Sequence, residues 1–168
     1  TLGKIVGGGL SIGVMCGKSE IMEFADTTGK KKSERSYVGG GTFSANPASM
    51  VAGYSTLDHL KSKRAVYSKI NDLGKFARKE IGKAFDGKVI VTGKGSLFMT
   101  HFLKDGISEI NNSSQAAKCD GSLLAKYHFK MIAHDGIFFL PGKLGAISDS
   151  HSKDDIKKIV KASEEFTC

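Results

Sequence analysis

The chain has 168 residues, and its 25 basic and 17 acidic side chains give a formal net charge of +8. This length and a hydrophobic content of 40% suit one or two globular domains and exclude a disordered chain. The three cysteines form no CxxC pair, which excludes a zinc finger or a disulfide scaffold and favours reduced thiols. No apolar run has the length of a membrane span and no signal peptide is evident, so we expect a cytoplasmic protein.

The first third of the chain is rich in glycine. Residues 2–17 include six glycines among apolar side chains, which disfavours a helix and predicts a tight turn followed by a buried strand over Ser11–Cys16. A short amphipathic helix over Ser19–Ala25 and a basic loop over 27–35 are expected next. Asn46-Pro47 then predicts the start of a helix, because Asn is a good N-cap and Pro suits the first helical position.

The rest of the chain alternates between helical and strand-like periods. The spacing of apolar residues predicts these elements in chain order: a helix over Arg64–Phe85, a hairpin of Lys88–Thr92 and Leu97–Leu103, a helix from about Ser122, a strand over Ile137–Leu140 and a last helix that begins at Ser152. This order indicates a fold of mixed α/β and α+β class. We divide it into the end of a larger domain (1–60), a linking helix (61–85) and a small α+β domain (86–168).

Most familiar site motifs are absent. Gly13–Ser19 is similar to a nucleotide phosphate loop but has one residue too few between its glycines. The five histidines show no metal-ligand spacing, so we expect them to be surface or hydrogen-bonded core residues, and we expect no metal site.

Two glycine-rich segments remain as candidates for chemistry. Lys4 lies between apolar neighbours, and a partly desolvated lysine has a lowered pKa and a neutral amine suited to Schiff-base formation. Gly41-Thr42 precedes a helix start, where free backbone N–H groups and a hydroxyl can hold a phosphate. The residues alone leave a purely structural role open for both segments.

Three stretches carry a resemblance to a known family. Lys4–Leu10 with the following Gly17–Met22, the loop Gly41–Pro47 (GTFSANP), and the pattern running from Ile137 to Ile156 are similar to class III (fold type I) pyridoxal-phosphate (PLP) aminotransferases. The resemblance is strongest to glutamate-1-semialdehyde 2,1-aminomutases, which make 5-aminolevulinate for porphyrin biosynthesis, and it covers essentially the whole chain.

The resemblance implies a role for each matched residue. Lys4 would form the internal aldimine with pyridoxal 5′-phosphate and move a proton on the substrate. Gly41 and Thr42 would bind the cofactor phosphate of the neighbouring subunit, so the enzyme would be a homodimer with its active site at the interface and a small amino-acid-like substrate. The groups that hold the pyridine ring would precede Thr1, so we expect the chain to be part of a longer protein and to be catalytically silent alone.

The chain departs from the family pattern at three places. Ser11 stands where the family usually has Pro, Ala45 replaces a Gly, and residues 142–148 contain no carboxylate where the aminomutase has an acidic substrate-side residue. A class III aminotransferase with another amino donor is therefore an alternative.

A basic binding module is the second alternative. Residues 61–83 contain eight basic side chains against two acidic ones, and Lys30–Lys32 add a further cluster. Arg is scarce and aromatic residues are not interleaved with these lysines, so we interpret them as a solvated face rather than a nucleic-acid surface.

Overall fold

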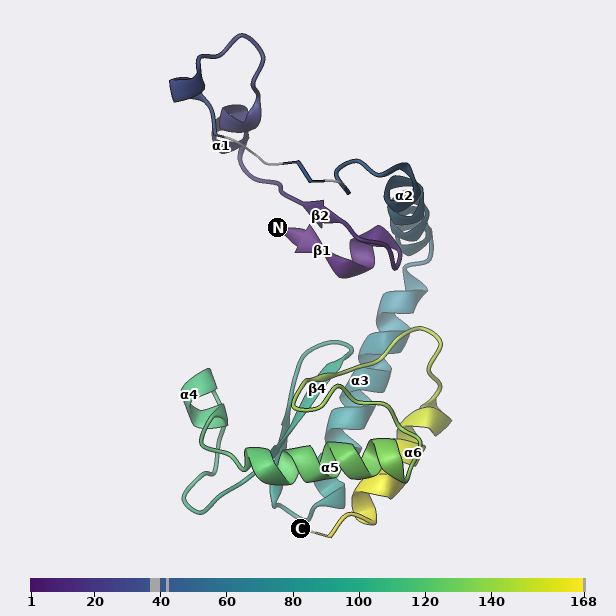
Figure 1. Cartoon of the computed structure of the whole chain (residues 1–168). Coiled ribbons are helices and arrows are strands. Elements are labelled where there is room, and N and C mark those ends of the chain that lie inside the picture. The colour runs from purple at the N-terminus through teal and green to yellow at the C-terminus, as the bar shows by residue number, and fades with distance from the viewer. Residues whose placement is uncertain (37–39, 42, 168) are drawn as a thin grey trace. The chain divides into compact units, whose positions relative to one another are not determined.

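A computed structural model describes residues 1–36, 40–41 and 43–167 (Figure 1). Contacts within the chain divide it into two units, Thr1–Arg64 and Ala65–Cys168. The predicted assignment of 1–60 to a larger domain, 61–85 to a linking helix and 86–168 to a small domain stays a prediction. Among the described residues, no helix is long and apolar enough to cross a membrane.

The first unit is built from short elements and one long helix. Its elements are β1 (Leu2–Gly3), the 3-10 helix η1 (Lys4–Gly7), β2 (Gly13–Val14), α1 (Ser19–Met22), η2 (Glu23–Ala25), η3 (Lys32–Glu34) and α2 (Pro47–Ser62). β1 and β2 pair antiparallel, with Leu2 opposite Val14. The predicted helices at Ser19 and Pro47 are confirmed. Asn46 caps α2 as predicted, since its side-chain oxygen accepts from the N–H groups of Ala48 and Ser49 at 3.0 and 3.2 Å.

The strand predicted over Ser11–Cys16 is confirmed only at Gly13–Val14, and its predicted burial is wrong. The strand is only Gly13–Val14, Val14 is half-buried, and the flanking Ser11 and Met15 are exposed. The apolar pattern predicts a buried strand, but within the described part of the chain its strand partner is the two-residue β1.

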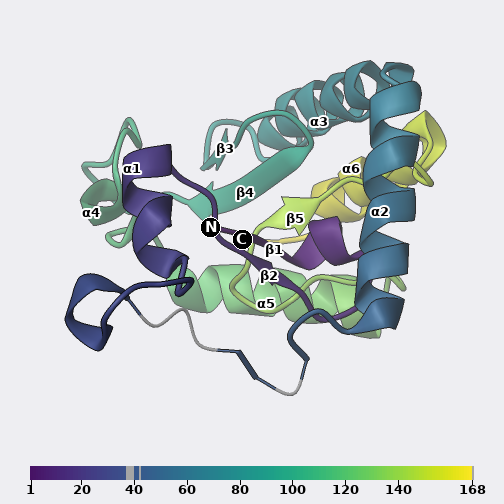
Figure 2. The same ribbon diagram turned by 90° about the horizontal axis from the view of Figure 1, so that it is seen from above.

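The second unit is a three-stranded antiparallel sheet between helices. Its elements are α3 (Ala65–Ala84), β3 (Val89–Thr92), β4 (Leu97–Phe102), α4 (Ser113–Ala116), α5 (Gly121–Ala133), β5 (Gly145–Ala146) and α6 (Lys153–Glu164). The strand order is β3-β4-β5, as Figure 2 shows, with Val89 opposite Phe102 and Leu97 opposite Ala146. The predicted helices, the hairpin and the capping box of Ser152 with Asp155 are confirmed.

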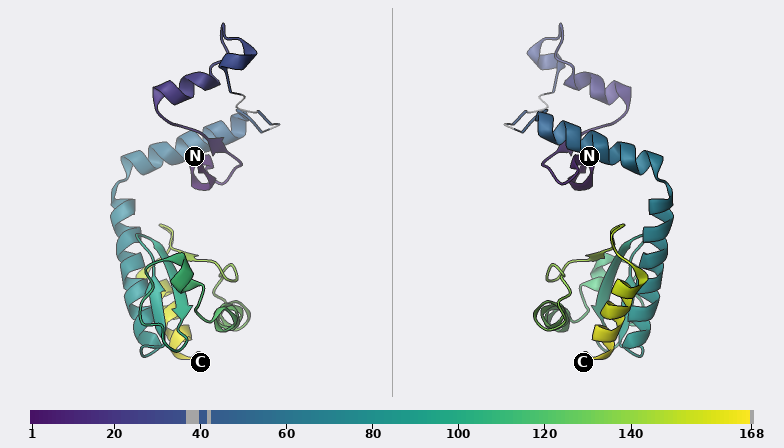
Figure 3. Two further views of the ribbon diagram at one scale, coloured as in Figure 1. Left: turned by 90° about the vertical axis from the view of Figure 1, so that its left-hand side faces the viewer. Right: turned by 90° about the vertical axis from the view of Figure 1, so that its right-hand side faces the viewer.

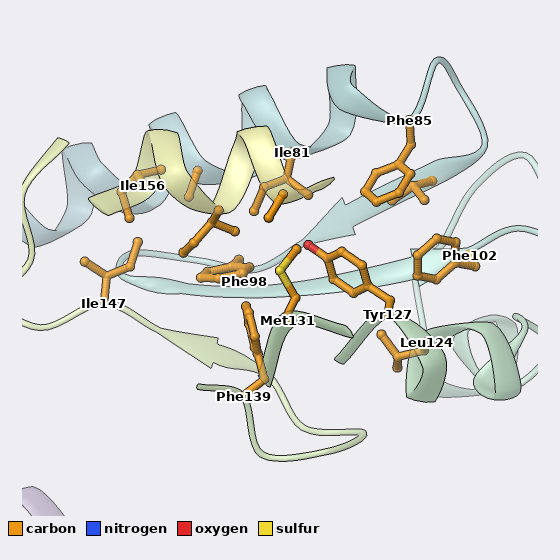
Figure 4. Packing of buried hydrophobic residues seen from close by; sticks show 14 residues of the cluster. Ile81, Phe85, Phe98, Phe102, Leu124, Tyr127, Met131, Phe139, Ile147 and Ile156 are labelled. Carbon is orange, nitrogen blue, oxygen red and sulfur yellow. The ribbon is translucent and has the colours of Figure 1, made fainter. Parts of the chain in front are cut away.

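The core of the second unit fills both faces of this sheet. α3 and α6 pack together over one face and α5 covers the other (Figures 3 and 4). Tyr127 of α5 meets Phe85 and Phe102 edge to face, with ring centroids 5.6 Å apart in both pairs. Its buried hydroxyl bonds to Ser163 of α6 at 2.8 Å, so this polar atom is satisfied inside the core.

The strand predicted over Ile137–Leu140 is also wrong. Phe139 enters the core while Phe138 and Leu140 are exposed, which produces a strand-like alternation without a strand. The position beside β4 is taken instead by β5. Gly145 fits there because it has no side chain, since a Cβ at that position would clash with the Phe98 ring.

Candidate active site

Lys4 lies at the start of a tight turn in the first unit. The chain leaves β1 at Gly3 and enters η1 at Lys4, whose φ is +56°. This is the left-handed region, which costs a residue with a side chain about 1–2 kcal/mol. Such an unfavourable backbone conformation persists only where its surroundings enforce it, and it is found preferentially at functional sites.

Close packing against α2 holds the lysine turn in place. A Cβ on Gly8 would lie 2.6 Å from the carbonyl oxygen of Ala52, and a Cβ on Gly53 would lie 2.6 Å from that of Val6. The backbone of the turn therefore contacts the backbone of α2 directly, as η1 beside α2 shows in Figures 1 and 2. Gly8 also closes the turn, since its N–H donates to the Ile5 carbonyl at 3.0 Å and its φ is +60°.

The Lys4 side chain reaches an open cavity. The cavity has a volume of about 530 Å³ and is lined by Lys4, Ile5 and Gly9–Ile12. Lys4 itself is exposed, and its apolar neighbours Leu2 and Ile5 are 54% and 68% exposed. The partial desolvation that the sequence predicts for this amine is therefore not provided by the described residues.

The second predicted loop is closed by hydrogen bonds of its own. Thr42 lies outside the described residues. The N–H of Gly41 donates to Ser44 Oγ at 2.8 Å, and the N–H of Ser44 donates back to the Gly41 carbonyl at 2.9 Å. Ala45, which replaces the glycine of the family pattern, has a φ of +51°. The loop thus keeps a conformation that suits glycine although the glycine is absent.

One further cavity joins segments that are distant in sequence. It has a volume of about 400 Å³ and is lined by Ser11–Gly13, Gly41, Phe43–Ala45 and Met50. Ser11 and Ile12 line both this cavity and the one at Lys4. Sequence patterns mark Ser11 only as a departure from Pro and do not single out Ser44. The signal available was a hydroxyl residue in each of the two glycine-rich segments.

In the second unit, His128 contacts the start of residues 142–148, the segment that contains no carboxylate. The buried imidazole accepts the N–H of Gly142 at Nδ1 (3.1 Å) and stacks on Phe139, with ring centroids 4.9 Å apart and planes 3° from parallel. Burial lowers its pKa, so the neutral ring that this hydrogen bond requires is favoured. His128 is thus a hydrogen-bonded core histidine, as predicted.

Several basic side chains of α3 have structural partners. Arg78 donates to the carbonyls of Gly95 and Leu97 at 2.7 Å, which ties α3 to the β3–β4 hairpin. Lys83 pairs with Glu80 at 3.0 Å and Lys69 pairs with Asp149 at 3.0 Å. The partners of these three side chains account for part of the basic cluster without an external partner.

Comparison with known proteins relates this arrangement to an enzyme family. No family model matches the chain. A glutamate-1-semialdehyde 2,1-aminomutase of Methanosarcina acetivorans is 36% identical over 98% of the chain. The chain is related to the C-terminal part of class III aminotransferases. It spans 37% of the length of that relative.

Solved aminotransferases have the same fold over the same portion. An omega-transaminase from Sphaerobacter thermophilus matches 97% of the chain and 36% of its own, with a TM-score of 0.78 and 27% identity. A beta-phenylalanine aminotransferase from Variovorax paradoxus matches 98% of the chain and 36% of its own, with a TM-score of 0.76 and 26% identity. The mixed α/β fold expected from the sequence is therefore confirmed as that of the C-terminal third of class III aminotransferases.

Proposed function

We propose that this chain supplies the cofactor lysine and a phosphate-binding loop to a PLP-dependent aminotransferase or aminomutase. The observation that carries the proposal is Lys4 itself. Its backbone is held in the left-handed region by a turn packed on α2, and its amine lies at the edge of an open cavity. An unfavourable backbone conformation is found preferentially at functional sites, and an amine at the edge of an open cavity can be reached by a cofactor.

The residues present fit pyridoxal 5′-phosphate. The cofactor, when bound, withdraws electrons from a bond at the amino-bearing carbon of the substrate. Lys4 holds the cofactor through its amine and accepts and returns a proton at that carbon. The Gly41–Ala45 loop precedes α2, whose dipole favours a negatively charged group near its N-terminus, and Thr42 adds a hydroxyl. In the proposed homodimer this phosphate belongs to the site of the neighbouring subunit.

The proposed substrate is a small amino-acid-like molecule. The relative from M. acetivorans supports glutamate-1-semialdehyde. The absence of a carboxylate from residues 142–148 and the match to a beta-phenylalanine aminotransferase support a different amino donor. A substrate panel distinguishes the two, because exclusive conversion of glutamate-1-semialdehyde to 5-aminolevulinate would contradict the second.

Covalent trapping tests the role of Lys4. Borohydride reduction in the presence of pyridoxal 5′-phosphate, followed by peptide mapping, should place the label on Lys4. Lys4→Arg, which keeps the charge but cannot be trapped, should lose the label. A label mainly on Lys18 or Lys94 would contradict the proposal.

A further inference from the structure

The basic loop that follows α1 is closed by its own hydrogen bonds. The N–H of Ser36 donates to the Phe24 carbonyl at 2.8 Å, so the two ends of the loop meet. The Lys30 ammonium donates to the Glu23 carbonyl beside this closure. Compact surface loops of about 6–16 residues with joined ends are frequently functional. Residues 24–36 therefore form an ordered loop that can hold its charged side chains in fixed places.

This loop has a cavity with positively charged walls. The cavity has a volume of about 440 Å³ and is lined by Thr27, Lys32, Arg35 and Ser36. A guanidinium, an ammonium and two hydroxyl groups thus line one space, and among the described residues that line it there is no acidic side chain. An anion bound here would meet attraction from two cations and no repulsion from the described walls.

The two carboxylates of the loop are turned toward its backbone. Asp26 and Glu34 each accept a backbone N–H of the loop, at 2.9 and 3.2 Å. Within the described part of the chain, no carboxylate forms an ion pair with Lys32 or Arg35. The described residues therefore give these two cations no counter-charge, and a bound anion would supply one.

Arg35 carries the strongest indication of the kind of anion. The residue is half-buried, and its Nη1 donates to the Thr27 carbonyl at 3.5 Å. This contact uses one of the five N–H donors of the guanidinium. The remaining donors can form paired hydrogen bonds with two oxygens of one phosphate, a geometry that lysine does not offer. Lys32 adds a second positive charge at the same cavity.

We propose that this cavity is a binding site for a phosphate group, with Arg35 as its bidentate contact and Lys32 as its second charge. The volume lies in the range of small-molecule sites, about 300–1,000 Å³, so the phosphate can be carried on a small molecule. The proposal is independent of the proposed function, because neither Lys4 nor the Gly41–Ala45 loop lines this cavity.

Titration of the 168-residue chain with inorganic phosphate tests the site, with sodium chloride used to keep the ionic strength constant. The amide resonances of Lys32 and Ser36 should shift. Arg35→Gln should weaken binding about 10-fold or more, as expected for the loss of a hydrogen bond to a charged group. Arg35→Lys keeps the charge without the paired donors and should have an intermediate affinity. Lys32→Gln should weaken binding less than Arg35→Gln, because lysine acts as a point charge.

Arg64→Gln is the matched control. Arg64 is exposed and does not line the cavity, and its substitution removes the same charge from the chain. Phosphate binding should therefore be nearly unchanged. Equal losses in Arg35→Gln and Arg64→Gln would show an effect of net charge alone and would overturn the inference. If Arg35→Gln alters the loop resonances before phosphate is added, Lys32→Gln decides, and unchanged binding in that variant also overturns the inference.

Comparison of two compounds separates the sources of the phosphate. Glycerol 3-phosphate and inorganic phosphate carry the same type of oxyanion, but only the first is an ester of a small molecule. Tighter binding of glycerol 3-phosphate assigns the site to a small phosphate ester, and tighter or equal binding of inorganic phosphate assigns it to the free ion. Acetate tests negative charge alone, and acetate binding as tight as that of phosphate would overturn the assignment to phosphate.

Discussion

The two units of the chain use their apolar side chains in opposite ways. In the second unit, all 14 side chains of the buried hydrophobic core lie between Ala77 and Ala162. In the first unit, the described residues that are buried are Gly7, Ser49 and Gly53. Eleven of its large apolar side chains are exposed, namely Leu2, Ile5, Leu10, Met15, Ile21, Phe24, Phe43, Met50, Val51, Tyr54 and Leu57.

This difference shows two distinct sources of order. The second unit is stabilised by burial of apolar surface and by aromatic contacts, the main favourable contributions in small domains. The first unit depends on helix caps, short turns and glycine-mediated contact between η1 and α2. An apolar surface of this extent is characteristic of a protein interface, which agrees with a proposed site completed by other parts of an aminotransferase.

The largest effect is expected when a phenylalanine is replaced by alanine in the second unit, and the same substitution in the first unit provides the comparison. Phe102 is 1% exposed and packs edge to face on Phe85 at 5.2 Å, whereas Phe43 is 66% exposed. Phe102→Ala should lower the free energy of unfolding by about 3–5 kcal/mol, since it leaves a cavity in the core. Phe43→Ala should change it by less than about 0.5 kcal/mol. Urea denaturation of both variants measures this, and similar losses would remove the contrast between the units.

The close approach of Gly53 to the Val6 carbonyl predicts the next largest effect. On helix propensity alone, Gly53→Ala within α2 should stabilise by about 1 kcal/mol. The close approach of the Val6 carbonyl predicts the opposite, a loss of about 1–3 kcal/mol, because the methyl group would be overpacked. Amide exchange of Gly8, whose N–H closes the lysine turn, should become faster.

Gly13→Ala serves as the control for this experiment. No heavy atom lies within 4 Å of a Cβ at that position, and its φ is not in the left-handed region. Exchange of the Gly8 amide should therefore be unchanged. If Gly53→Ala slows that exchange instead, propensity outweighs the contact and the lysine turn is not held by α2.

Local signals made much of this fold predictable. The Asn46-Pro47 cap, the Ser152 capping box and the hairpin after Gly87 depend on residues close in sequence, and the structure has all three. Strand pairing depends on partners outside the segment itself. The strand expected over Ser11–Cys16 is therefore limited to Gly13–Val14, and the one expected over Ile137–Leu140 is wrong. A two-residue period alone does not distinguish a paired strand from an extended loop such as Phe138–Leu140.

The candidate site likewise has features that local sequence predicts and features that depend on packing between distant segments. Lys4 was singled out from its apolar neighbours and its place in the glycine-rich segment, but its positive φ and its exposure depend on packing against α2 and are not visible in local sequence. The cavity shared by residues 11–13 and 41–45 depends on the same packing. The roles of Lys4, Gly41 and Thr42 stay predictions.

The second unit should also become less stable in mild acid. Burial lowers the pKa of His128 and of His101 below the ordinary value of 6.5. In the window between 6.5 and these lower values the unfolded chain binds more protons than the folded one, so unfolding becomes more favourable as the pH falls. Their contribution is complete above about pH 6.5 and is lost as the pH falls through the folded pKa values.

The variant His128→Phe tests whether His128 causes this pH dependence. Phenylalanine keeps a ring to stack on Phe139 but cannot titrate, so the loss of stability between pH 7 and 5 should be smaller than in the original chain. An identical slope in His128→Phe would show that this imidazole does not titrate differently in the folded unit.

The smallest expected effect concerns Ala45 in the first unit. A left-handed φ costs an alanine about 1–2 kcal/mol, and Ala45→Gly removes that cost. Glycine in turn loses about 0.5–1 kcal/mol more conformational entropy on folding, so the net gain should be about 0.5–1 kcal/mol. The gain should be local and should appear as slower amide exchange at Ser44 and Asn46, whose N–H groups close this loop. Because no core of the second unit is involved, its amide exchange should not change, and slower exchange in both units would contradict their independent stabilisation.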